Sequence, residues 1–358
     1  MKIFLSGGGT LGPVTPLLAM QKSIARVYPD VQFLWVGTKD GPERELVTEA
    51  RIPFVPIRSG KLRRYFSLRI FFDLFGVAVG FFQSVMLVWK EDPTLCISAG
   101  GYTSVPLHLA AWLFGVPTWV HQQDVRVGLA NRLMAPFAKQ VTTALEINVK
   151  KFAQKKTFHL GNPVRSDLYT GSKKKAKTLF GLLTDKPVIF ATGGGTGSMK
   201  VNQMVIEALH HLEGECEVIH LSGKERPQEL VERTQQHFVH YHPFVFFTDE
   251  MKHAYAAADI VISRGGFGTL TEIAALGKAA IIIPKPGHQE ENVHFLAEQD
   301  AVVLVDERTS DGHYLANTIR TLLADTKKIA HMGHLLQTLL PPAKDEDITT
   351  LASRFLNQ

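Results

Sequence analysis

The sequence contains little cysteine and no pattern of a secretory leader. Only Cys96 and Cys216 occur among the 358 residues, in different halves of the chain and in apolar surroundings. This argues against a disulfide framework and favours a reducing compartment, the cytoplasm. The apolar opening, residues 1–5, stops at once in Ser6-Gly7-Gly8-Gly9 and is too short for the core of a signal peptide, so we predict that it forms a first β-strand.

The sequence also lacks a long uncharged hydrophobic run and a basic cluster. Its most apolar stretch, residues 74–89, contains Gln83 and is bounded by Asp73 and Lys90, which leaves it short of the ~20 apolar residues of a membrane-spanning helix. The formal net charge is +5, but the clearest basic run, residues 173–175, stands alone without interleaved aromatic residues. We interpret that run as solvated surface and expect no nucleic-acid partner.

What the sequence does have is the rhythm of two packed α/β domains. It is 45% hydrophobic with 29 glycines and no low-complexity tract, and its length suits two domain cores better than one. Apolar runs of strand length end in glycine or polar turns and are followed by segments of helical period, which indicates parallel sheets covered on both faces. The predicted strands are residues 3–6, 31–36, 95–98 and 118–121 in the first half and 188–192, 218–221, 245–247, 260–263 and 280–284 in the second.

A loop with a proline marks the predicted domain boundary. Gly161-Asn162-Pro163-Val164 interrupts the pattern after the strand-like pair His159-Leu160. The predicted domains are therefore residues 1–162 and 163–340. A proline pair then precedes a last helical segment, residues 348–355, within a C-terminal portion of residues 341–358.

A glycine loop follows the first predicted strand and precedes a helix expected from about Pro16. Glycines bring backbone close to a ligand, and free amides at a helix N-terminus favour negative or polar groups. The alternative is a tight turn without a ligand. Gly7, Gly9 and Gly12 match the dinucleotide spacing, but Gly37-Thr38-Lys39 stands where an acidic residue would follow strand two, so NAD binding is disfavoured.

Two more glycine loops occur in the second half. Residues 192–198 repeat the arrangement of strand, glycine loop and helix, and the absence of a Gly-Lys-Ser/Thr sequence excludes a Walker loop. Two such loops suit a ligand bound between domains, with a pyrophosphate held on backbone amides. Residues 263–272 form the third loop, in which Gly268 and Thr269 provide a phosphate seat and Glu272 can accept hydrogen bonds from a ribose diol. The alternative for Glu272 is a carboxylate that only stabilises the helix N-terminus.

Taken together, these loops and four further motifs resemble one family of enzymes over essentially the whole chain. The sequence is similar to the undecaprenyl-diphospho-muramoylpentapeptide β-N-acetylglucosaminyltransferases of peptidoglycan synthesis, in glycosyltransferase family 28. The motifs occur in the family's order: Gly8-Gly9-Thr10, Ser98-Ala99-Gly100-Gly101-Tyr102, His121-Gln122-Gln123, Gly161-Asn162-Pro163-Val164-Arg165, Gly193 to Gly197, Arg264 to Glu272 and His288-Gln289.

The resemblance implies the GT-B fold, two Rossmann-like domains whose parallel sheets face across a cleft. It implies transfer of N-acetylglucosamine from UDP-N-acetylglucosamine to lipid I with inversion, forming lipid II, with no metal and no cofactor. The first domain would bind the acceptor and associate with the membrane, the second would bind the donor, and the C-terminal helix would pack back on the first.

The resemblance also implies roles for individual residues. It puts Arg165 and the loop Gly193, Gly194, Gly195, Thr196 and Gly197 at the donor diphosphate, beside the Gly268-Thr269 seat. It puts Glu272 at the ribose and Gln289 at the sugar. On the acceptor side it puts Thr10 and Gly12 at the edge of the site, with Leu11 between them. Tyr102, after two glycines, suits a second loop that faces the acceptor; the alternative is an aromatic ring that only packs in the core.

The sequence departs from the family on the acceptor side. The family's first loop ends in a histidine, where this chain has Pro13, which cannot move a proton. The family's His-Glu-Gln-Asn is His121-Gln122-Gln123-Asp124 here, so a carboxylate is lost and another is gained two residues later. A base must take the proton from the attacking hydroxyl. Our hypothesis is that Asp124 is this base, with His121 the other candidate; the alternatives are a loop carboxylate that caps amides and a buried structural histidine.

Basic and aromatic residues mix in one segment of the first half, which suits contact with anionic lipid. The alternative is that the aromatic residues pack a helix against the sheet. With a polyprenyl-linked substrate, the segment predicts a peripheral protein at the cytoplasmic face of the inner membrane, with cell-wall synthesis proteins as possible partners. The residues are Lys61, Arg63, Arg64, Tyr65, Phe66, Arg69, Ile70, Phe71, Phe72, Leu74, Phe75, Phe81 and Phe82.

Three other functions remain open at this point. A related GT-B glycosyltransferase could use a different lipid acceptor, such as a diacylglycerol, because the acceptor-side motifs are the altered ones. A catalytically silent UDP-sugar-binding protein would bind the donor without turnover. A UDP-sugar epimerase would bind the same donor, but the basic and aromatic segment counts against it.

Overall fold

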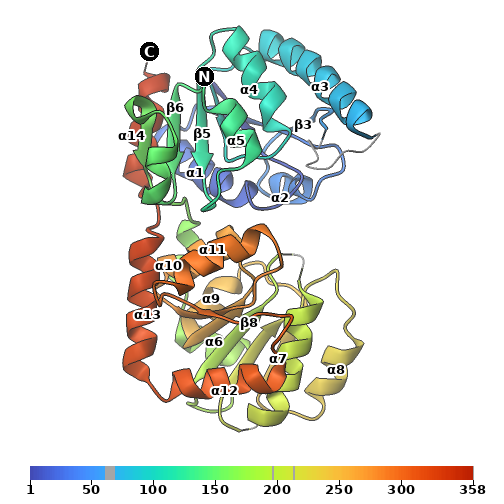
Figure 1. Cartoon of the computed structure of the whole chain (residues 1–358), viewed down its shortest axis with the longest axis vertical. Coiled ribbons are helices and arrows are strands. Elements are labelled where there is room, and N and C mark those ends of the chain that lie inside the picture. The colour runs from blue at the N-terminus through green and yellow to red at the C-terminus, as the bar shows by residue number, and fades with distance from the viewer. Residues whose placement is uncertain (61–68, 196, 213, 358) are drawn as a thin grey trace. The chain divides into compact units, whose positions relative to one another are not determined.

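The structure, a computed structural model, describes residues 1–60, 69–195, 197–212 and 214–357 (Figure 1). It divides the chain into two compact units. Unit 1 comprises Met1–Arg165 together with Pro342–Gln358, and unit 2 comprises Ser166–Pro341. Unit 2 is thus inserted between two parts of unit 1, and the first crossing falls three residues after the predicted boundary.

Unit 1 is built on a parallel sheet of seven strands in the order β3-β2-β1-β4-β5-β6-β7. Central strands β1, β4 and β5 are fully buried apart from Lys2, as strands covered on both faces must be. The strands are β1 (Lys2–Ser6), β2 (Gln32–Gly37), β3 (Phe54–Pro56), β4 (Leu95–Ser98), β5 (Thr118–Gln122), β6 (Gln140–Thr143) and β7 (Thr157–His159).

The helices of unit 1 cover both faces of this sheet. Helix α1 (Val14–Val27) buries Val14, Leu17, Met20 and Ile24, which recur at helical spacing. The other helices are α2 (Glu43–Glu49), α3 (Arg69–Glu91), α4 (Ser104–Leu113), α5 (Leu129–Met134) and α14 (Asp345–Leu356), with 3-10 turns η1 (Glu146–Lys151) and η2 (Gln154–Lys156).

Helix α14 belongs to unit 1 and packs against α1. Its apolar side joins the core that contains Leu17 and Trp35, and its first residue, Asp345, accepts hydrogen bonds from Ser23 Oγ at 2.6 Å and from Arg26 Nη1 at 2.7 Å. The chain returns to unit 1 through a parallel bridge between Asn162 and Pro342. The buried residues of α14 are Ile348, Leu351, Ala352, Phe355 and Leu356.

Unit 2 is built on a parallel sheet of six strands in the order β10-β9-β8-β11-β12-β13. Its strands are β8 (Val188–Thr192), β9 (Glu217–Leu221), β10 (Tyr241–Phe244), β11 (Ile260–Ser263), β12 (Ala279–Ile282) and β13 (Val303–Leu304). Its helices are α6 (Lys173–Leu179), α7 (Met199–Leu212), α8 (Glu229–Gln235), α9 (Met251–Ala257), α10 (Phe267–Ala275), α11 (His288–Ala297), α12 (Gly312–Leu323) and α13 (Thr326–Leu339), with 3-10 turn η3 (Ser166–Thr170).

One predicted strand is wrong and four strands were not predicted. The predicted strand at residues 245–247 lies beyond β10, and Val245 and Phe246 are exposed. The real strand contains Pro243, which an edge strand tolerates because one side of it needs no ladder hydrogen bond. The unpredicted strands β3, β6, β7 and β13 are at or near sheet edges and are short or polar.

No helix among the described residues is long and apolar enough to cross a membrane. Helix α3 holds the apolar stretch at residues 74–89, within a helix of 23 residues. The basic and aromatic residues at 61–68, Lys61, Arg63, Arg64, Tyr65 and Phe66, lie outside the residues that the structure describes.

Candidate functional site

Each sheet has a topological switch point, where the strand order reverses and ligands of α/β proteins gather. In unit 1 it lies between β1 and β4, and in unit 2 between β8 and β11. All three glycine loops of the sequence follow these strands. The switch points therefore place the glycine loops at the carboxyl end of each sheet.

The first glycine loop of unit 1 is held in a conformation that needs glycine. Gly9 has φ +81°, and a Cβ at this position would lie 2.2 Å from Cε1 of Tyr102. The Tyr102 ring therefore packs directly against the loop. Thr10 and Gly12 are exposed and Leu11 is half-buried, and the carbonyl of Gly12 accepts a hydrogen bond from Gln123 Nε2 at 3.3 Å.

The loop after β4 reaches the first loop across the switch point. Gly100 and Gly101 have φ +105° and +95°, and a Cβ on Gly101 would lie 2.9 Å from both N and O of Gly8. Ser104 Oγ donates to the carbonyl of Ser6 at 2.9 Å. The structure thus brings Tyr102 against Gly9, in the loop that continues into Thr10 and Gly12. The acceptor-side role of these residues stays a prediction.

A carboxylate supports the first loop from behind, and our sequence analysis missed it. Glu43, the first residue of α2, is fully buried and accepts a hydrogen bond from the amide of Gly9 at 3.2 Å. In the sequence, Gly37, Thr38 and Gly41 precede the glutamate within a few residues. This pattern does not by itself show that Glu43 lies against the first loop, because that contact depends on how α2 folds back.

The two candidates for the base lie in very different surroundings. His121 has no exposed surface; its Nδ1 lies 2.9 Å from Thr142 Oγ1 and its Nε2 lies 2.9 Å from Asn162 Oδ1. Burial lowers the pKa of His121 to about 4, partly offset by the bond to Asn162, so the ring is neutral at pH 7. Asp124 is half-buried on the loop after β5.

That loop is shaped by amide side chains. Gln122 Nε2 donates to the carbonyl of Asp124 at 2.7 Å and to that of Arg126 at 3.2 Å, and Asn148 Nδ2 donates to the carbonyl of Asp124 at 2.9 Å. A glutamate in place of Gln122 could not donate these bonds when ionised. Gln122, which departs from the family's motif, therefore stabilises the backbone of the loop that contains Asp124.

In unit 2 the glycine loop after β8 closes tightly on its neighbours. Gly194 has φ +82° and its amide donates to Thr192 Oγ1 at 3.1 Å. Gly197 has φ +72°, and a Cβ there would lie 2.4 Å from the carbonyl of Ser222. Gly193 is half-buried and Gly195 is exposed, while Thr196 lies outside the described residues.

Arg264, directly after β11, connects this loop to the segments that follow β12 and β13. Its Nε donates to Ser198 Oγ at 2.8 Å, and its Nη1 donates to the carbonyl of Ile283 at 3.0 Å and to Glu307. Both charged side chains are largely buried, with 14% of Arg264 and 18% of Glu307 exposed. The sequence placed Arg264 in a motif but gave it no role, because its partners are distant in the chain.

Helices α10 and α11 bring the remaining donor-side candidates of unit 2 together. Gly268, Thr269 and Glu272 are half-buried in the first turns of α10, and Glu272 Oε2 accepts from the Tyr255 hydroxyl at 3.0 Å. Gln289 begins α11, and its Nε2 lies 3.9 Å from the Cβ position of Gly266. Arg165 is the last residue of the first part of unit 1 and is half-buried.

No group of three or more His, Cys, Asp or Glu side chains that could hold a metal ion occurs in the described part of the chain.

Comparisons with known proteins cover both units. The model of the glycosyltransferase family 28 N-terminal domain matches residues 3–143, and the model of the family 28 C-terminal domain matches residues 188–340. These matches span the switch points of both sheets.

Curated relatives share one name. The UDP-N-acetylglucosamine–N-acetylmuramyl-(pentapeptide) pyrophosphoryl-undecaprenol N-acetylglucosamine transferase of Desulforamulus reducens is 32% identical over 371 residues, covering 99% of each chain. The transferase of the same name from Clostridium kluyveri is 38% identical over 284 residues, covering 79% of this chain and 78% of its own.

Solved structures share the fold. A MurG structure from Acinetobacter baumannii has a TM-score of 0.75 at 24% identity and covers 99% of both chains. A UDP-GlcNAc 2-epimerase from Neisseria meningitidis, bound to UDP-GlcNAc, has a TM-score of 0.69 at 14% identity and covers 100% of both chains. Since the fold is common to transferases and epimerases, the fold by itself does not choose between them.

Proposed function

Because this chain belongs to glycosyltransferase family 28, we propose that it transfers N-acetylglucosamine from UDP-N-acetylglucosamine to lipid I, forming lipid II. The observation that carries this function is the match to a transferase of that name over 99% of both chains. The chain is accordingly an N-acetylglucosaminyltransferase of peptidoglycan synthesis, with two parallel α/β units.

Unit 2 binds the donor. The amides of the Gly193–Gly197 loop and of the Gly268-Thr269 turn hold the diphosphate, because amides at helix N-termini favour anions. The guanidinium of Arg165, which ends the first part of unit 1, is a further candidate for the diphosphate. Glu272 accepts the ribose hydroxyls, and the hydrogen bond from Tyr255 supports its orientation. Gln289 contacts the sugar from the start of α11.

Unit 1 binds the acceptor along the edge formed by Thr10, Leu11, Gly12 and Tyr102. The exposure of Thr10 and Gly12 supports this role, as does the packing of Tyr102 on Gly9. The loop ends at Pro13, which lies at the N-cap of α1 and has no proton to exchange. The proton must therefore move elsewhere.

Asp124 takes the proton from the attacking hydroxyl of the acceptor. The oxygen attacks the anomeric carbon from the face opposite the leaving UDP, the C–O bond to the diphosphate breaks, and the carboxylate holds the proton. The half-buried position of Asp124 supports this assignment. His121 is a positioning residue, because its nitrogens are both engaged and its pKa of about 4 leaves it a weak base at pH 7.

Unit 1 also carries an apolar surface that supports peripheral contact with a membrane. Phe75, Phe82, Met86 and Trp89 are 65 to 74% exposed and recur at helical spacing along α3. Helix α4 packs beside α3, and α5 packs beside α4. Their exposed apolar residues are Trp112, Leu113, Phe114, Leu129, Leu133 and Phe137, with Lys90, Arg132 and Lys139 exposed among them.

A surface of this composition inserts aromatic side chains at the headgroup level while its lysines and arginines attract anionic lipid. Docking at the cytoplasmic face of the inner membrane brings unit 1 to the diphosphate of a polyprenyl-linked acceptor. The exposed apolar side chains of α3 thus support membrane contact even when the residues at 61–68 are left out of the argument.

The test is transfer of labelled N-acetylglucosamine from UDP-N-acetylglucosamine to a lipid I analogue in detergent with EDTA, with donor binding measured by calorimetry. Labelled lipid II analogue is the expected product. Donor binding with transfer only to diacylglycerol would instead establish a different acceptor, and binding without any product a silent binder. Formation of UDP-N-acetylmannosamine without an acceptor would identify an epimerase.

A further inference from the structure

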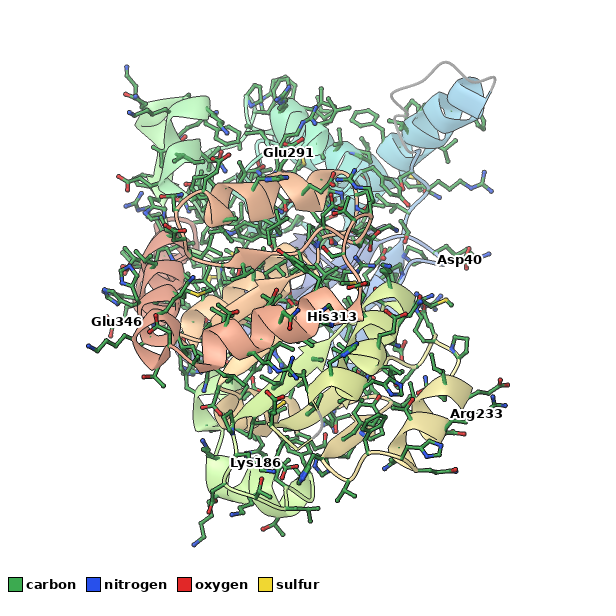
Figure 2. All side chains as sticks on the ribbon, turned by 60° about the horizontal axis from the view of Figure 1, so that its bottom comes forward. Asp40, Lys186, Arg233, Glu291, His313 and Glu346 are labelled. Atoms are coloured by element: carbon green, nitrogen blue, oxygen red, sulfur yellow. The ribbon has the colours of Figure 1, made fainter. Side chains whose placement is uncertain are left out.

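Glu43 is an acidic side chain with no exposed surface, directly beneath the first glycine loop. Its Oε1 accepts a hydrogen bond from the amide of Thr38 at 2.7 Å and another from Thr38 Oγ1, and its Oε2 accepts from the amide of Gly9 at 3.2 Å. Asp40, three residues earlier, is exposed and projects from the surface (Figure 2). A buried carboxylate is costly unless several donors meet it, so its contacts must be specific.

Three glycines make room for this carboxylate. A Cβ on Gly8 would lie 2.4 Å from Glu43 Oε1, one on Gly41 would lie 2.1 Å from Oε2, and one on Gly37 would lie 3.1 Å from Oε1. Two of these distances are closer than any real Cβ contact. The glycines at the end of β1, at the end of β2 and before α2 thus form a cradle for the Glu43 carboxylate, which shares it with Thr38 Oγ1 beside Gly41 and the Phe54 ring beside Gly37.

The same loop also contacts the segment after β4. Tyr102 packs on Gly9, and the buried hydroxyl of Thr103 lies 3.1 Å from the Cβ position of Gly8. The Gly8-Gly9 backbone is therefore fixed between the carboxylate and the Tyr102-Thr103 segment. Because the Gly9 amide points inward to Glu43, the next residues, Thr10 to Gly12, are the part of the loop that projects outward.

We propose that Glu43 is a positioning residue for acceptor binding, which sets the loop so that Thr10 and Gly12 meet the acceptor. This inference rests on the proposed function, in which unit 1 binds the acceptor. Glu43 does not touch the acceptor; it acts through the Gly9 amide. Loss of its carboxylate releases the loop and weakens binding of the acceptor, while binding of the donor by unit 2 is unchanged.

Glu43→Gln tests the proposal with little change in volume. Both carboxylate oxygens accept from backbone or hydroxyl donors, whereas glutamine has one acceptor oxygen and one NH₂ group, so one side of the cradle would face donor to donor. The expected result is a rise of roughly tenfold in KM for the lipid I analogue, with KM for UDP-N-acetylglucosamine within twofold of wild type. The matched control is Glu49→Gln, an exposed glutamate in the same helix.

Gly41→Ala is the second variant, because it keeps the carboxylate but fills the cradle. It is expected to raise KM for the acceptor in the same direction, and thermal unfolding measured by circular dichroism reports how much of each variant is folded. A merely structural role would lower the unfolding temperature and the amount of active enzyme and leave both KM values unchanged, which would overturn the proposal.

Binding of a fluorescent lipid I analogue without donor separates this inference from the proposed function. Wild-type protein that neither binds nor glycosylates the analogue would overturn both. Wild-type protein that transfers normally, beside a Glu43→Gln variant with the same acceptor affinity, would overturn the role of Glu43 alone.

Discussion

The glycine loops of the two units follow the same plan, but a side chain of opposite charge supports each one. In unit 1 the loop after β1 rests on the carboxylate of Glu43, and in unit 2 the loop after β8 is tied through Ser198 to the guanidinium of Arg264. A buried negative charge disfavours a second anion nearby, whereas a positive charge favours one. Two loops of similar backbone thus differ in the group behind them, a carboxylate in unit 1 and a guanidinium paired with Glu307 in unit 2. In our proposal, the donor diphosphate binds to the loop of unit 2.

The two units are alike in a second feature, a buried histidine on a strand. His121 of β5 contacts Thr142 and Asn162, and His220 of β9 contacts Tyr241 Oη at 2.7 Å and Asn202 Oδ1 at 3.1 Å. Burial lowers the pKa of each to about 4. Since unit 2 has such a histidine as well, the arrangement is better explained by the architecture of the sheets than by catalysis. This agrees with our proposal that Asp124, and not His121, is the base.

Asp124→Asn is the strongest test of that asymmetry. Loss of the base is expected to lower kcat by roughly 10²- to 10⁴-fold, with KM for the donor little changed, because unit 2 is untouched. Initial rates at saturating UDP-N-acetylglucosamine measure this, and Asp30→Asn, on the surface of unit 1, is the control. Near-normal turnover of Asp124→Asn would show that Asp124 is not the base.

Arg264→Met asks whether the positive charge behind the second loop matters for the donor. The change removes the bond to Ser198 and leaves Glu307 without its cation, which is expected to cost about 3 kcal/mol of unfolding free energy. We expect a rise of roughly 30-fold in KM for UDP-N-acetylglucosamine, and an unchanged KM for the acceptor.

Urea unfolding and steady-state kinetics measure both effects of the Arg264 change. Arg233→Met, which alters an exposed arginine of α8 in the same unit, is the control (Figure 2). Equal loss of acceptor and donor affinity in Arg264→Met would show that the charges behind the loops do not divide the substrates between the units.

Acid pH tests the likeness of the two histidines. Because their folded pKa values lie below the ordinary 6.5, the unfolded chain binds protons more readily; their stability contribution is complete above pH 6.5 and is lost as pH falls toward 4. Each group contributes up to about 1.4 kcal/mol per pH unit across that window. Urea unfolding from pH 7 to pH 4.5 should give a shallower slope for His121→Gln and for His220→Gln than for wild type, and equal slopes would refute the shared role.

Trp89→Ser tests another difference between the units, the apolar surface that we assign to unit 1, and has the smallest expected effect. Trp89 is 74% exposed, so its loss should reduce binding to vesicles of anionic lipid by a few fold and leave transfer in detergent unchanged. The control is Leu230→Ser in unit 2, which is 51% exposed and lies outside that surface. Equal loss in the two variants would mean that vesicle binding is not specific to unit 1.

The sequence predicted the strands that lie at the centre of each sheet. Strands such as β4, β8 and β11 are short apolar runs that end before a glycine loop, and burial on both faces leaves this pattern clear. Edge strands carry weaker patterns. Strand β10 was misplaced because Pro243 hides it and the exposed Val245-Phe246 pair imitates a strand.

For the candidate site, the sequence indicated the loops and not what holds them. Glycine loops and Glu272 stand in local motifs, so their positions are readable without a structure. The contacts of Glu43 and Arg264 join segments that are distant in the chain or turned back upon it, and no local pattern specifies which way such a side chain points. The same holds for His121, whose partners lie 21 and 41 residues away.

Because helix α14 returns to unit 1, the two units cannot be completed in the order in which they are synthesised on the ribosome. All of unit 2 is synthesised before Ile348 to Leu356 are made, and these residues supply part of the core beside Leu17 and Trp35. Domains tend to fold as units during synthesis. The part of the chain made first is therefore the part completed last, and a nascent unit 1 must wait, with an apolar face of α1 uncovered, until translation has passed through all of unit 2.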